Sequence, residues 1–360
     1  MEKILTIAVP TYNMEAYLDA CLSSMIMDDP ELMAALEVIV VNDGSLDRSL
    51  DIAMWYKGRF PNTFLVIDKE NGNYGSCVNR ALKEARGKYF RIVDADDWVD
   101  TTALKDFIEG LKEIEIDLVM TPYCIESVGD ITRIGYSNKV RLNYEYNIKS
   151  ISYHLFDSPL QMHGMTYRTS ILHQCNLRLT EGVSYTDTEY CFYPLSYIQT
   201  LVFWSMSLYH YRADRDGQTM SVCSLKKSTQ SMLLIAKKML RSNTANYEDM
   251  KSADCIMSYQ VLNRLLWLFY YTSLVLCKKS KHIENQLNEI HSIIYSYPSI
   301  LNGIRNFKYN RIRFVLMWEM TGLYNSSLVM SLYNRLFSYL KRIKYILKFS
   351  TKPQFKNNED

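Results

Sequence analysis

Asp94, Asp96 and Asp97 place three carboxylates within four residues, directly after the apolar run Tyr89–Val93. Tyr, Phe, Ile and Val are typical of a buried strand, so we expect the acids at the carboxyl end of a strand, where ligands bind in open α/β sheets. Carboxylates this close repel one another unless water or a divalent cation offsets their charge. Hard oxygen ligands on a short turn suit Mg²⁺ or Mn²⁺ bound with a phosphate-bearing substrate. The alternative is an exposed acidic turn in which Asp97 or Asp100 caps the next helix.

A second polar segment follows the first apolar run of the chain, Leu5–Val9. It consists of Pro10, Thr11, Tyr12 and Asn13. Their hydroxyls, amide and aromatic ring could stack on a base or hydrogen-bond to it. The alternative is ordinary turn chemistry, with Asn13 as the N-cap of the next helix.

The next two apolar runs also end in polar loops. Asp43 follows the second run, and Gly44 beside it lets the backbone turn sharply, so the carboxylate could accept hydrogen bonds from a base edge. The alternative there is a helix cap by Ser45. Lys69–Gly75 follows the third run and opens the helix that carries Asn79. This loop is rich in glycine but fits neither GxGxxG nor GxxxxGK[ST], so neither a Rossmann dinucleotide site nor a P-loop is supported.

The elements that must position these loops alternate between strands and helices over the first 123 residues. Because helical crossovers join parallel strands, the pattern predicts an α/β fold with a mainly parallel sheet covered by helices on both faces. We expect Gly87 to end a helix as a left-handed cap. The expected strands are Leu5–Val9, Val38–Val41, Phe64–Ile67, Tyr89–Val93 and Leu118–Tyr123, and the expected helices are Ala16–Met25, Asp47–Lys57, Cys77–Ala85 and Thr101–Ile114.

In the second half of the chain, the spacing of apolar and polar residues changes twice. Residues 127–146 alternate polar and apolar side chains, as in antiparallel edge strands, and residues 161–211 mix strands with a helix. After about residue 224 the spacing is helical almost throughout. The helices expected there include Met232–Leu240, Val261–Leu276, Ile283–Tyr295 and Ile312–Met320. The composition shift near residue 222 predicts a domain boundary.

Composition narrows the class of protein. The 360 residues carry a formal charge of +2, which gives no strong electrostatic signature for the whole chain. The eight cysteines are scattered without CxxC spacing, which indicates reduced thiols in a cytoplasmic protein. The most apolar run, Leu265–Cys277, is too short to span a bilayer, and the start of the chain lacks the length of a signal peptide.

A basic amphipathic segment ends the chain. Residues 305–356 hold eleven Lys or Arg and one acid, Glu319, and Leu332–Phe349 has the spacing of a helix with an apolar side. Such a helix can lie in a membrane interface, attracted by anionic lipid. The alternative is a terminal helix packed on the helical region with a solvated basic face. We expect no nucleic acid as partner, because no recognised motif accompanies the charge.

Together these segments resemble family 2 glycosyltransferases of the GT-A fold over about the first 125 residues. The motifs that carry the resemblance are Val9–Asn13, Val40–Asp47, Asn71–Gly75 with Asn79–Leu82, and Gly87–Tyr89 leading into Asp94–Asp97. The resemblance implies a nucleotide-activated sugar, often UDP-linked, bound at these loops. It implies that Asp43 contacts the base with Thr11 and Tyr12 beside it. Asp94, Asp96 and Asp97 would form a DxD-type element that holds the ribose and a metal on the diphosphate.

Mn²⁺ or Mg²⁺ is therefore expected as cofactor, with Asp96 and Asp97 as the favoured ligands. His210 could be a third ligand, whereas the remaining histidines form no metal-binding spacing. A divalent cation would stabilise the nucleoside diphosphate as it leaves. The donor site implied by the resemblance consists of Pro10, Thr11, Tyr12, Asn13, Asp43, Asn73, Gly75, Asn79, Asp94, Ala95, Asp96, Arg215 and Gln218.

A base must also deprotonate the acceptor hydroxyl. The family usually supplies it from a Glu-Asp pair at the start of a helix, and the similar segment here is Ser184–Tyr190, with Thr186 in the place of the Glu. We assign the base to Asp187, with Glu189 as second choice, and an Asp base implies inversion at the anomeric carbon. Alternatively Thr186 or Asp187 caps the helix, with Glu189 completing a capping box.

The sequence thus predicts an inverting, metal-dependent glycosyltransferase of hexosyltransferase type in surface polysaccharide assembly, on the cytoplasmic side of the cell membrane. Its acceptor would be a saccharide or a lipid-linked saccharide. Residues 1–222 would form the GT-A domain, with a nucleotide-sugar half (1–123) and an acceptor half (124–222), and residues 223–360 a helical region with the basic tail. The alternatives are a catalytically degenerate scaffold for another transferase and a nucleotidyltransferase, which would need a basic glycine-rich loop after the first strand.

Overall fold

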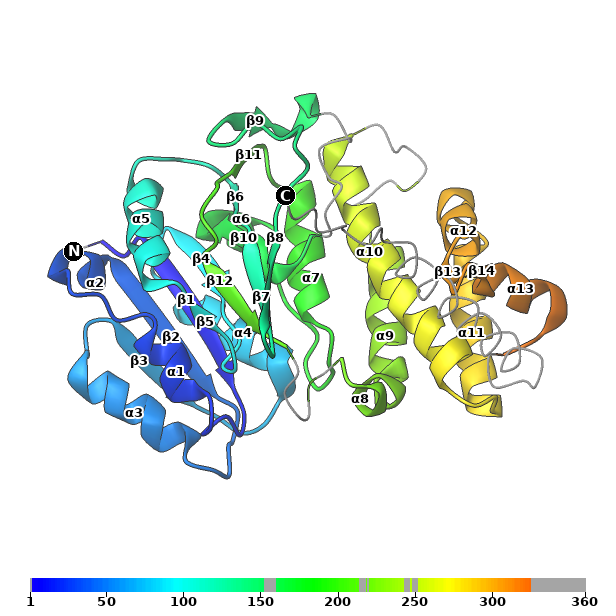
Figure 1. Ribbon diagram of the computed structural model, residues 1–360, viewed down its shortest axis with the longest axis horizontal. Helices are drawn as coiled ribbons and strands as arrows, with labels where there is room; N and C mark the ends of the chain where they lie inside the picture. The colour runs from blue at the N-terminus through cyan, green and yellow to red at the C-terminus, as the bar shows by residue number, and fades with distance from the viewer. Residues whose placement is uncertain are drawn as a thin grey trace, which may run out of the picture.

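A computed structural model of the protein describes residues 2–151, 160–213, 218, 220–242, 247 and 252–324. Figure 1 shows a sheet domain followed by a helical region along the long axis of the molecule. Arg215 and the basic segment 332–349 lie outside the described residues.

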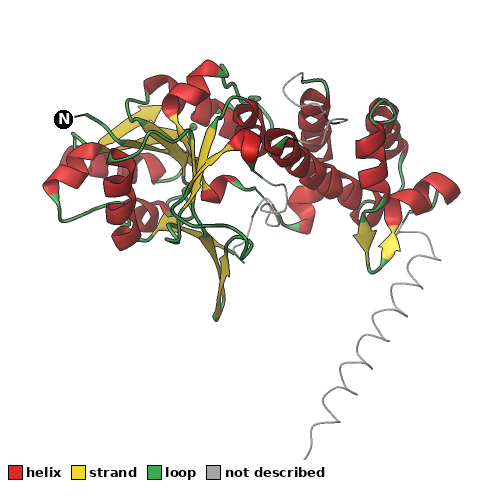
Figure 2. Cartoon of the chain, turned by 90° about the horizontal axis from the view of Figure 1, so that it is seen from above, coloured by secondary structure: helices red, strands yellow, loops and turns green. Residues whose placement is uncertain are grey.

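The central sheet has eight strands, and the prediction of a mainly parallel sheet is confirmed. β1 (Leu5–Thr11) pairs in parallel with both β2 (Leu36–Asn42) and β4 (Tyr89–Ile92), whereas β10 (Met165–Arg168) runs antiparallel to its two neighbours. The strand order is β3 (Phe64–Asp68), β2, β1, β4, β10, β6 (Leu118–Met120), β11 (Thr200–Phe203) and β9 (Glu145–Asn147). Every residue of β1 and β2 is buried, as expected for parallel strands with helices on both faces (Figure 2).

Helices connect the strands of the first half. Their bounds are α1 (Leu18–Ser23), α2 (Pro30–Ala35), α3 (Ser49–Arg59), α4 (Asn73–Glu84) and α5 (Thr101–Lys112). The short α2 was not predicted. Its start is set by Asp29, whose side chain accepts hydrogen bonds from two backbone amides of the first turn, and by Pro30 at the first helical position.

Two local predictions were wrong. Gly87 does not adopt a left-handed conformation, and α4 ends instead at Ala85 in extended backbone. Glycine is required at residue 87 for another reason, because a Cβ there would lie 2.5 Å from the backbone nitrogen of Thr6. Asn13 does not cap a helix either, since α1 begins at Leu18.

A second sheet packs its strands beside the end of β4. Its order is β5 (Trp98–Val99), β12 (Tyr209–Arg212), β7 (Tyr123–Ser127) and β8 (Asp130–Ile134). The pairing of β12 with β5 brings Tyr209 and Arg212 next to the acidic segment that precedes β5. The expected strand Leu118–Tyr123 is therefore two strands, because β6 and β7 belong to different sheets.

Five short helices of the described chain alternate in the sequence with the later strands. These are the 3₁₀ turns η1 (Ile148–Ser150), η3 (Met162–Gly164) and η4 (Tyr193–Ser196), and the helices α6 (Thr169–Gln174) and α7 (Asp187–Phe192). His163 lies on η3 and Asp187 on α7, and both residues belong to the site described below.

The rest of the described chain is helical, as predicted, apart from a small hairpin. The elements are α8 (Val222–Lys227), α9 (Thr229–Leu240), α10 (Ala253–Tyr271) with a π-helical turn (Thr272–Leu276), α11 (Lys281–Ile294), α12 (Pro298–Arg305), β13 (Lys308–Tyr309), β14 (Ile312–Arg313) and α13 (Phe314–Thr321). α10 packs against both α9 and α7, so it joins the helical region to the sheet domain (Figure 1). Within the described ranges, no helix combines the length and the apolar character needed to cross a bilayer.

Candidate functional site

The acidic segment follows β4 directly and is buried rather than exposed. Asp96 is 9 % and Asp97 1 % exposed, and the amide of Asp97 donates to the carbonyl of Asp94 at 3.0 Å, which closes a tight turn. α5 is capped by Asp100, whose Oδ1 accepts from the amide of Ala103 at 2.7 Å. The alternative of an exposed acidic turn is therefore wrong for Asp96 and Asp97, although Asp100 does cap the helix.

Neighbouring elements orient two of these carboxylates. Oδ2 of Asp97 accepts from the hydroxyl of Tyr209, and its Oδ1 accepts from the backbone amide of Arg212 at 2.7 Å. Oδ1 of Asp94 accepts from the hydroxyl of Tyr74 on α4 at 2.9 Å. Burial and then the adjacent carboxylates raise the pKa of Asp94 well above its usual range and the pKa of Asp97 to about 7. The negatively charged forms of these carboxylates are therefore unfavourable by themselves, and a bound cation would stabilise them.

His163 joins these carboxylates from η3. One ligand atom each of Asp94, Asp97 and His163 lies within 4.8 Å of the others. Burial, with smaller effects of Arg264 and Arg91, lowers the pKa of His163 to about 3, so the imidazole stays neutral and can donate a lone pair. Two carboxylates and a neutral imidazole are a donor set that fits a divalent cation such as Mn²⁺.

This grouping matches the sequence prediction only in part. Asp97, predicted as a metal ligand, lies in the group together with Asp94, which was predicted on the ribose side, and the metal role of Asp96 stays a prediction. His210 lies elsewhere: its Nδ1 is 2.7 Å from Oε1 of Glu126 and its ring stacks on Trp98. Sequence reasoning missed His163, which no metal-binding spacing marks.

Arg91 supports the turn that carries His163. Its guanidinium is fully buried in β4 and donates to the carbonyl of His163 and, at 2.8 Å, to Oγ1 of Thr166. The side chain of Thr121 lies 3.3 Å from the same guanidinium. Burying an arginine is costly unless its donors are used, so these contacts hold η3 at a defined distance from β4.

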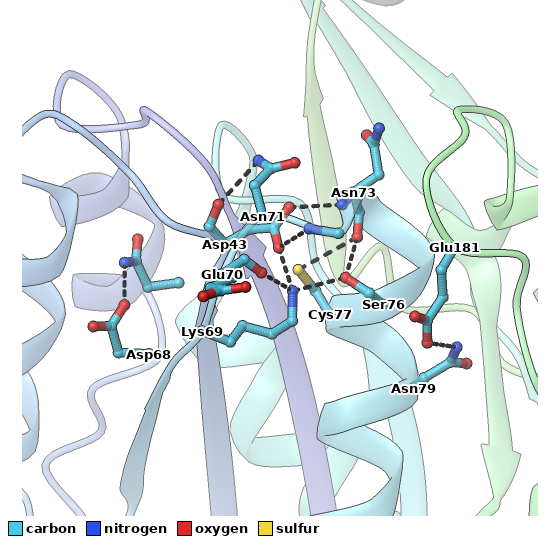
Figure 3. A network of polar contacts seen from close by, with 12 residues as sticks. Asp43, Asp68, Lys69, Glu70, Asn71, Asn73, Ser76, Cys77, Asn79 and Glu181 are labelled. Carbon is cyan, nitrogen blue, oxygen red and sulfur yellow. Dashed lines mark hydrogen bonds and ion pairs between the residues drawn. The ribbon is translucent and has the colours of Figure 1, made fainter.

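Asp43 lies at the centre of a separate network at the edge of the sheet (Figure 3). Its carboxylate is 2 % exposed and accepts from the backbone amides of Gly72 and Asn73 at 2.9 Å each, at the start of α4. Lys69 forms an ion pair with it, and Nδ2 of Asn71 donates to its carbonyl at 3.0 Å. The loops after β2 and β3 are thus joined through Asp43, and its contact with a base stays a prediction.

The other predicted donor residues of α4 contact residues 179–181. Asn79 exchanges hydrogen bonds of 2.9 and 2.8 Å with the backbone of Leu179, and Nδ2 of Asn79 also donates to Glu181 at 3.0 Å (Figure 3). A Cβ at Gly75 would lie 2.3 Å from the carbonyl oxygen of Thr180, so glycine is required for this close approach. These contacts give both residues a structural task in addition to the predicted one.

The segment Pro10–Asn13, at the end of β1 and just after it, has one accessible aromatic ring. Pro10 and Thr11 are buried in β1, and Oγ1 of Thr11 donates to the carbonyl of Val9 at 3.1 Å, whereas Tyr12 is 45 % exposed. Asn13 adopts a left-handed conformation, and its Oδ1 accepts from the amide of Leu46 at 2.8 Å. Tyr12 is therefore the member of this segment that is open to a ligand ring.

Asp187 and Glu189 lie on the first turn of α7 but in different surroundings. Burial raises the pKa of Asp187, and Arg264 is the largest opposing influence. Glu189 is fully buried and accepts from the amide and hydroxyl of Thr180 at 2.6 and 2.9 Å, with Lys238 alongside. The capping-box alternative is wrong, because Glu189 bonds to Thr180 and Thr186 makes no side-chain cap. These contacts favour Asp187 over Glu189 as a base.

The remaining predicted donor residues are Ala95, which is 2 % exposed within the acidic turn, and the pair Arg215 and Gln218. Nε2 of Gln218 donates to the carbonyl of Arg212, so it lies near the strand that binds Asp97. Arg215 lies outside the described residues, and its role on the diphosphate stays a prediction.

Comparison with known proteins bears on the first half of the chain above all. Residues 6–171 match the family described as Glycosyl transferase family 2. EpsH of Bacillus subtilis strain 168 is 36 % identical over 121 residues, which is 34 % of either chain. The poly(ribitol-phosphate) β-N-acetylglucosaminyltransferase TarS of Staphylococcus aureus is 33 % identical over 116 residues, which is 32 % of this chain and 20 % of TarS. The match thus spans about a third of the length of EpsH and a fifth of that of TarS.

Solved structures show the fold over a longer range. The crystal structure of TarS residues 1–349 in complex with UDP-GlcNAc superposes with a TM-score of 0.59 at 21 % identity, covering 88 % of this chain and 87 % of that one. The mannosyltransferase PcManGT of Pyrobaculum calidifontis, solved with GDP-Man and Mn²⁺, gives 0.51 at 16 % identity and covers 84 % of both chains. The architecture is therefore of the GT-A type.

Proposed function

Because residues 6–171 match the model of glycosyltransferase family 2, we propose that the protein transfers a sugar from a UDP-linked donor to a hydroxyl of a saccharide or lipid-linked saccharide acceptor. The reaction would serve the assembly of a bacterial surface polysaccharide, the setting that the TarS resemblance supports. The choice of a UDP-linked donor rests on the UDP-GlcNAc in the TarS crystal structure.

One observation carries the proposal. Asp94, Asp97 and His163 gather at the carboxyl end of β4, and Asp187 lies close enough to the same group to raise the pKa of Asp94. A cation held by the first three would carry the diphosphate of the donor and stabilise the charge that develops on it. The proposed base and the proposed leaving-group site thus border the same region, and a single displacement would place the two on opposite sides of the anomeric carbon.

The residues of this chain divide the chemistry between two sides. On the donor side, Asp43 and Tyr12 would receive the base, and Asp94 and Asp97 the ribose and diphosphate. On the acceptor side, Asp187 would accept the proton of the attacking hydroxyl. The hydroxyl oxygen bonds to the anomeric carbon while the bond from that carbon to the diphosphate oxygen breaks, and the electron pair leaves with UDP. A direct attack of this kind inverts the anomeric carbon.

The experiment is a thermal-shift screen of UDP, GDP and a panel of UDP-sugars, each with and without Mn²⁺ or Mg²⁺. A ligand that binds only the folded state adds about 2.7 kcal/mol to the free energy of unfolding at a hundredfold excess over Kd, and this stabilisation raises Tm. We expect a UDP-dependent shift that Mn²⁺ enlarges and that D97N abolishes, and hydrolysis of at least one UDP-sugar. If no nucleotide shifts Tm, the proposal is wrong.

The same screen tests the two alternatives. A degenerate scaffold would bind UDP without hydrolysing any UDP-sugar, and D187N would change nothing measurable. A nucleotidyltransferase would release diphosphate from a nucleoside triphosphate, for which the segment Pro10–Asn13 offers no basic glycine-rich loop.

A further inference from the structure

Tyr209 contacts every member of the candidate cation group, which consists of Asp94, Asp97 and His163. It lies on β12 and is fully buried, and the family match ends before this strand, at residue 171. The pairing of β12 with β5 sets Tyr209 beside Val99, two residues after the acidic turn. Its side chain therefore reaches the cation group from a strand that follows the matched segment.

The hydroxyl of Tyr209 is used twice, once as a donor and once as an acceptor. It donates to Oδ2 of Asp97, and its oxygen accepts from the backbone amide of Asp94 at 3.3 Å. A phenol has a single proton to donate, so the carboxylate takes that proton and the amide takes a lone pair. One hydroxyl thus sets the rotation of the Asp97 carboxylate and the position of the backbone at Asp94.

The ring of Tyr209 contacts the third member of the cation group. Its centroid lies 4.8 Å from that of the His163 imidazole, and the two planes are 65° apart, an edge-to-face arrangement. The rings of Tyr123 and Tyr211 lie 5.2 and 5.1 Å from the same imidazole. Aromatic rings thus enclose His163, and Tyr209 joins this enclosure to the acidic turn.

The strand that carries Tyr209 holds both oxygens of the Asp97 carboxylate. The backbone amide of Arg212 donates to Oδ1 at 2.7 Å, while the hydroxyl of Tyr209 donates to Oδ2. A carboxylate offers about four lone pairs, so each oxygen keeps one that a cation can use. β12 therefore orients Asp97 without using up its capacity to bind a cation.

We propose that Tyr209 is the positioning residue that sets the mutual geometry of the cation group and thereby its affinity for a divalent cation. The proposal rests on the proposed function, in which this group holds the cation on the diphosphate of the donor. Groups that orient metal ligands typically contribute about ten- to a hundredfold to metal affinity. Tyr209 acts through the three residues that it contacts and does not bind the cation itself.

The test uses the full chain and measures the Kd for Mn²⁺ and for Mg²⁺ by titration calorimetry in the presence of UDP. Y209F removes the hydroxyl and keeps the ring. We expect both Kd values to rise by the same factor, about ten- to a hundredfold, because both cations use the carboxylates that the hydroxyl orients. Y167F is the matched control. It removes the hydroxyl of another fully buried tyrosine, on β10, which has no hydrogen-bond partner among the described residues, and it should leave both Kd values unchanged.

Two further measurements separate positioning from a general effect on the fold. At saturating Mn²⁺, the electron paramagnetic resonance spectrum of the bound ion should change in Y209F, because its ligands are held differently, whereas a loss of stability alone leaves the spectrum of the folded protein as it is. Tyr209→4-aminophenylalanine keeps an N–H donor in the place of the hydroxyl and should recover part of the affinity. The Tm of each variant reports whether it is folded, and the 4-aminophenylalanine variant serves if Y209F is not.

The outcomes distinguish the two proposals. If D97N abolishes Mn²⁺ binding while Y209F changes neither the Kd nor the spectrum, the role of Tyr209 is wrong and the proposed function stands. If the natural protein hydrolyses a UDP-sugar without any divalent cation, the cation group is wrong and the role of Tyr209 falls with it. A loss in Y209F that is confined to Mn²⁺, or that Y167F reproduces, also overturns the proposal.

Discussion

The hydroxyl of Tyr74 lies 2.9 Å from Oδ1 of Asp94, so the helix after the third strand holds the carboxylate that follows the fourth. Such a hydrogen bond fixes which way a ligand oxygen points. Groups that orient metal ligands in this way typically contribute ten- to a hundredfold to metal affinity.

Removing this hydroxyl should therefore weaken cation binding without unfolding the protein. We expect Y74F to raise the Kd for Mn²⁺ about tenfold, as measured by titration calorimetry in the presence of UDP. Y144F removes an exposed hydroxyl far from α4 in sequence and should change nothing. An unchanged Mn²⁺ affinity in Y74F would show that Asp94 is not a ligand held by Tyr74.

The grouping of Asp94, Asp97 and His163 predicts a preference among cations. Imidazole suits transition metals, whereas Mg²⁺ prefers oxygen ligands and keeps its water. H163Q should thus weaken the binding of Mn²⁺ more than that of Mg²⁺, and D97N should weaken both. The measurement is the Kd of each cation with UDP bound. Equal losses for both cations in H163Q would show that His163 does not set the preference, and unchanged affinities would place it outside the coordination sphere.

Asp43 is predicted to support the fold as well as the donor. Its carboxylate accepts hydrogen bonds from two backbone amides and forms an ion pair with Lys69. D43N replaces one carboxylate oxygen by an amide nitrogen, so at least one of these donors loses its charged acceptor. We expect D43N to lower the free energy of unfolding by about 1–3 kcal/mol, measured by urea denaturation without nucleotide. N62D, a change of similar size at an exposed residue in the turn between α3 and β3, is the control. A D43N protein of unchanged stability that loses UDP affinity would mean that Asp43 acts on the donor alone.

The sequence predicts those parts of this fold whose signal is local. Apolar runs such as Val38–Val41 and Tyr89–Val93 lie within or at observed strands because burial on both faces demands continuous apolar residues. The acids after β4 could be located for the same reason. Gly87 shows the limit of local reasoning: a glycine after a helix suggests a left-handed cap, but here it is required by the backbone of Thr6, which is distant in the sequence.

The parts of the site that were not predicted depend on contacts between distant segments. His163 reaches the carboxylates because β10 runs antiparallel between β4 and β6, and nothing near residue 163 encodes that pairing. Arg264 reaches Gln161 only because α10 packs on the sheet domain. Residues of this kind carry no characteristic spacing, so they become visible only when the elements are assembled.

The basic segment 332–349 gives a prediction about membranes that needs no structure of the segment. If its apolar side and its lysines and arginines bind anionic lipid, deletion of residues 328–360 should abolish co-sedimentation with vesicles that contain phosphatidylglycerol. Full-length protein should sediment at low salt and be released as the ionic strength rises. Identical fractionation of the truncated and full-length proteins would show that the segment does not bind membrane.

His291 gives a prediction about stability and pH. Its Nδ1 lies 2.8 Å from the hydroxyl of Tyr270 and its Nε2 2.8 Å from Oε1 of Glu319, an arrangement that suits a neutral ring. Burial lowers the pKa of His291 below its ordinary value of about 6.5, against the opposing effect of Glu319. Below pH 6.5, His291 is mostly protonated in the unfolded chain, whereas in the folded chain it takes up the proton only at a lower pH.

The stabilisation that neutral His291 contributes is therefore fully present above pH 6.5 and is lost as the pH falls below it. The free energy of unfolding decreases by at most about 1.4 kcal/mol per pH unit in that range. H291Q should be less stable than the natural protein at pH 7.5, and the difference in Tm should narrow as the pH is lowered to 5.5. H173Q, which changes an exposed histidine, should show no such narrowing. A difference for H291Q that stays constant between pH 7.5 and 5.5 would mean that His291 has the same pKa in the folded and unfolded chain.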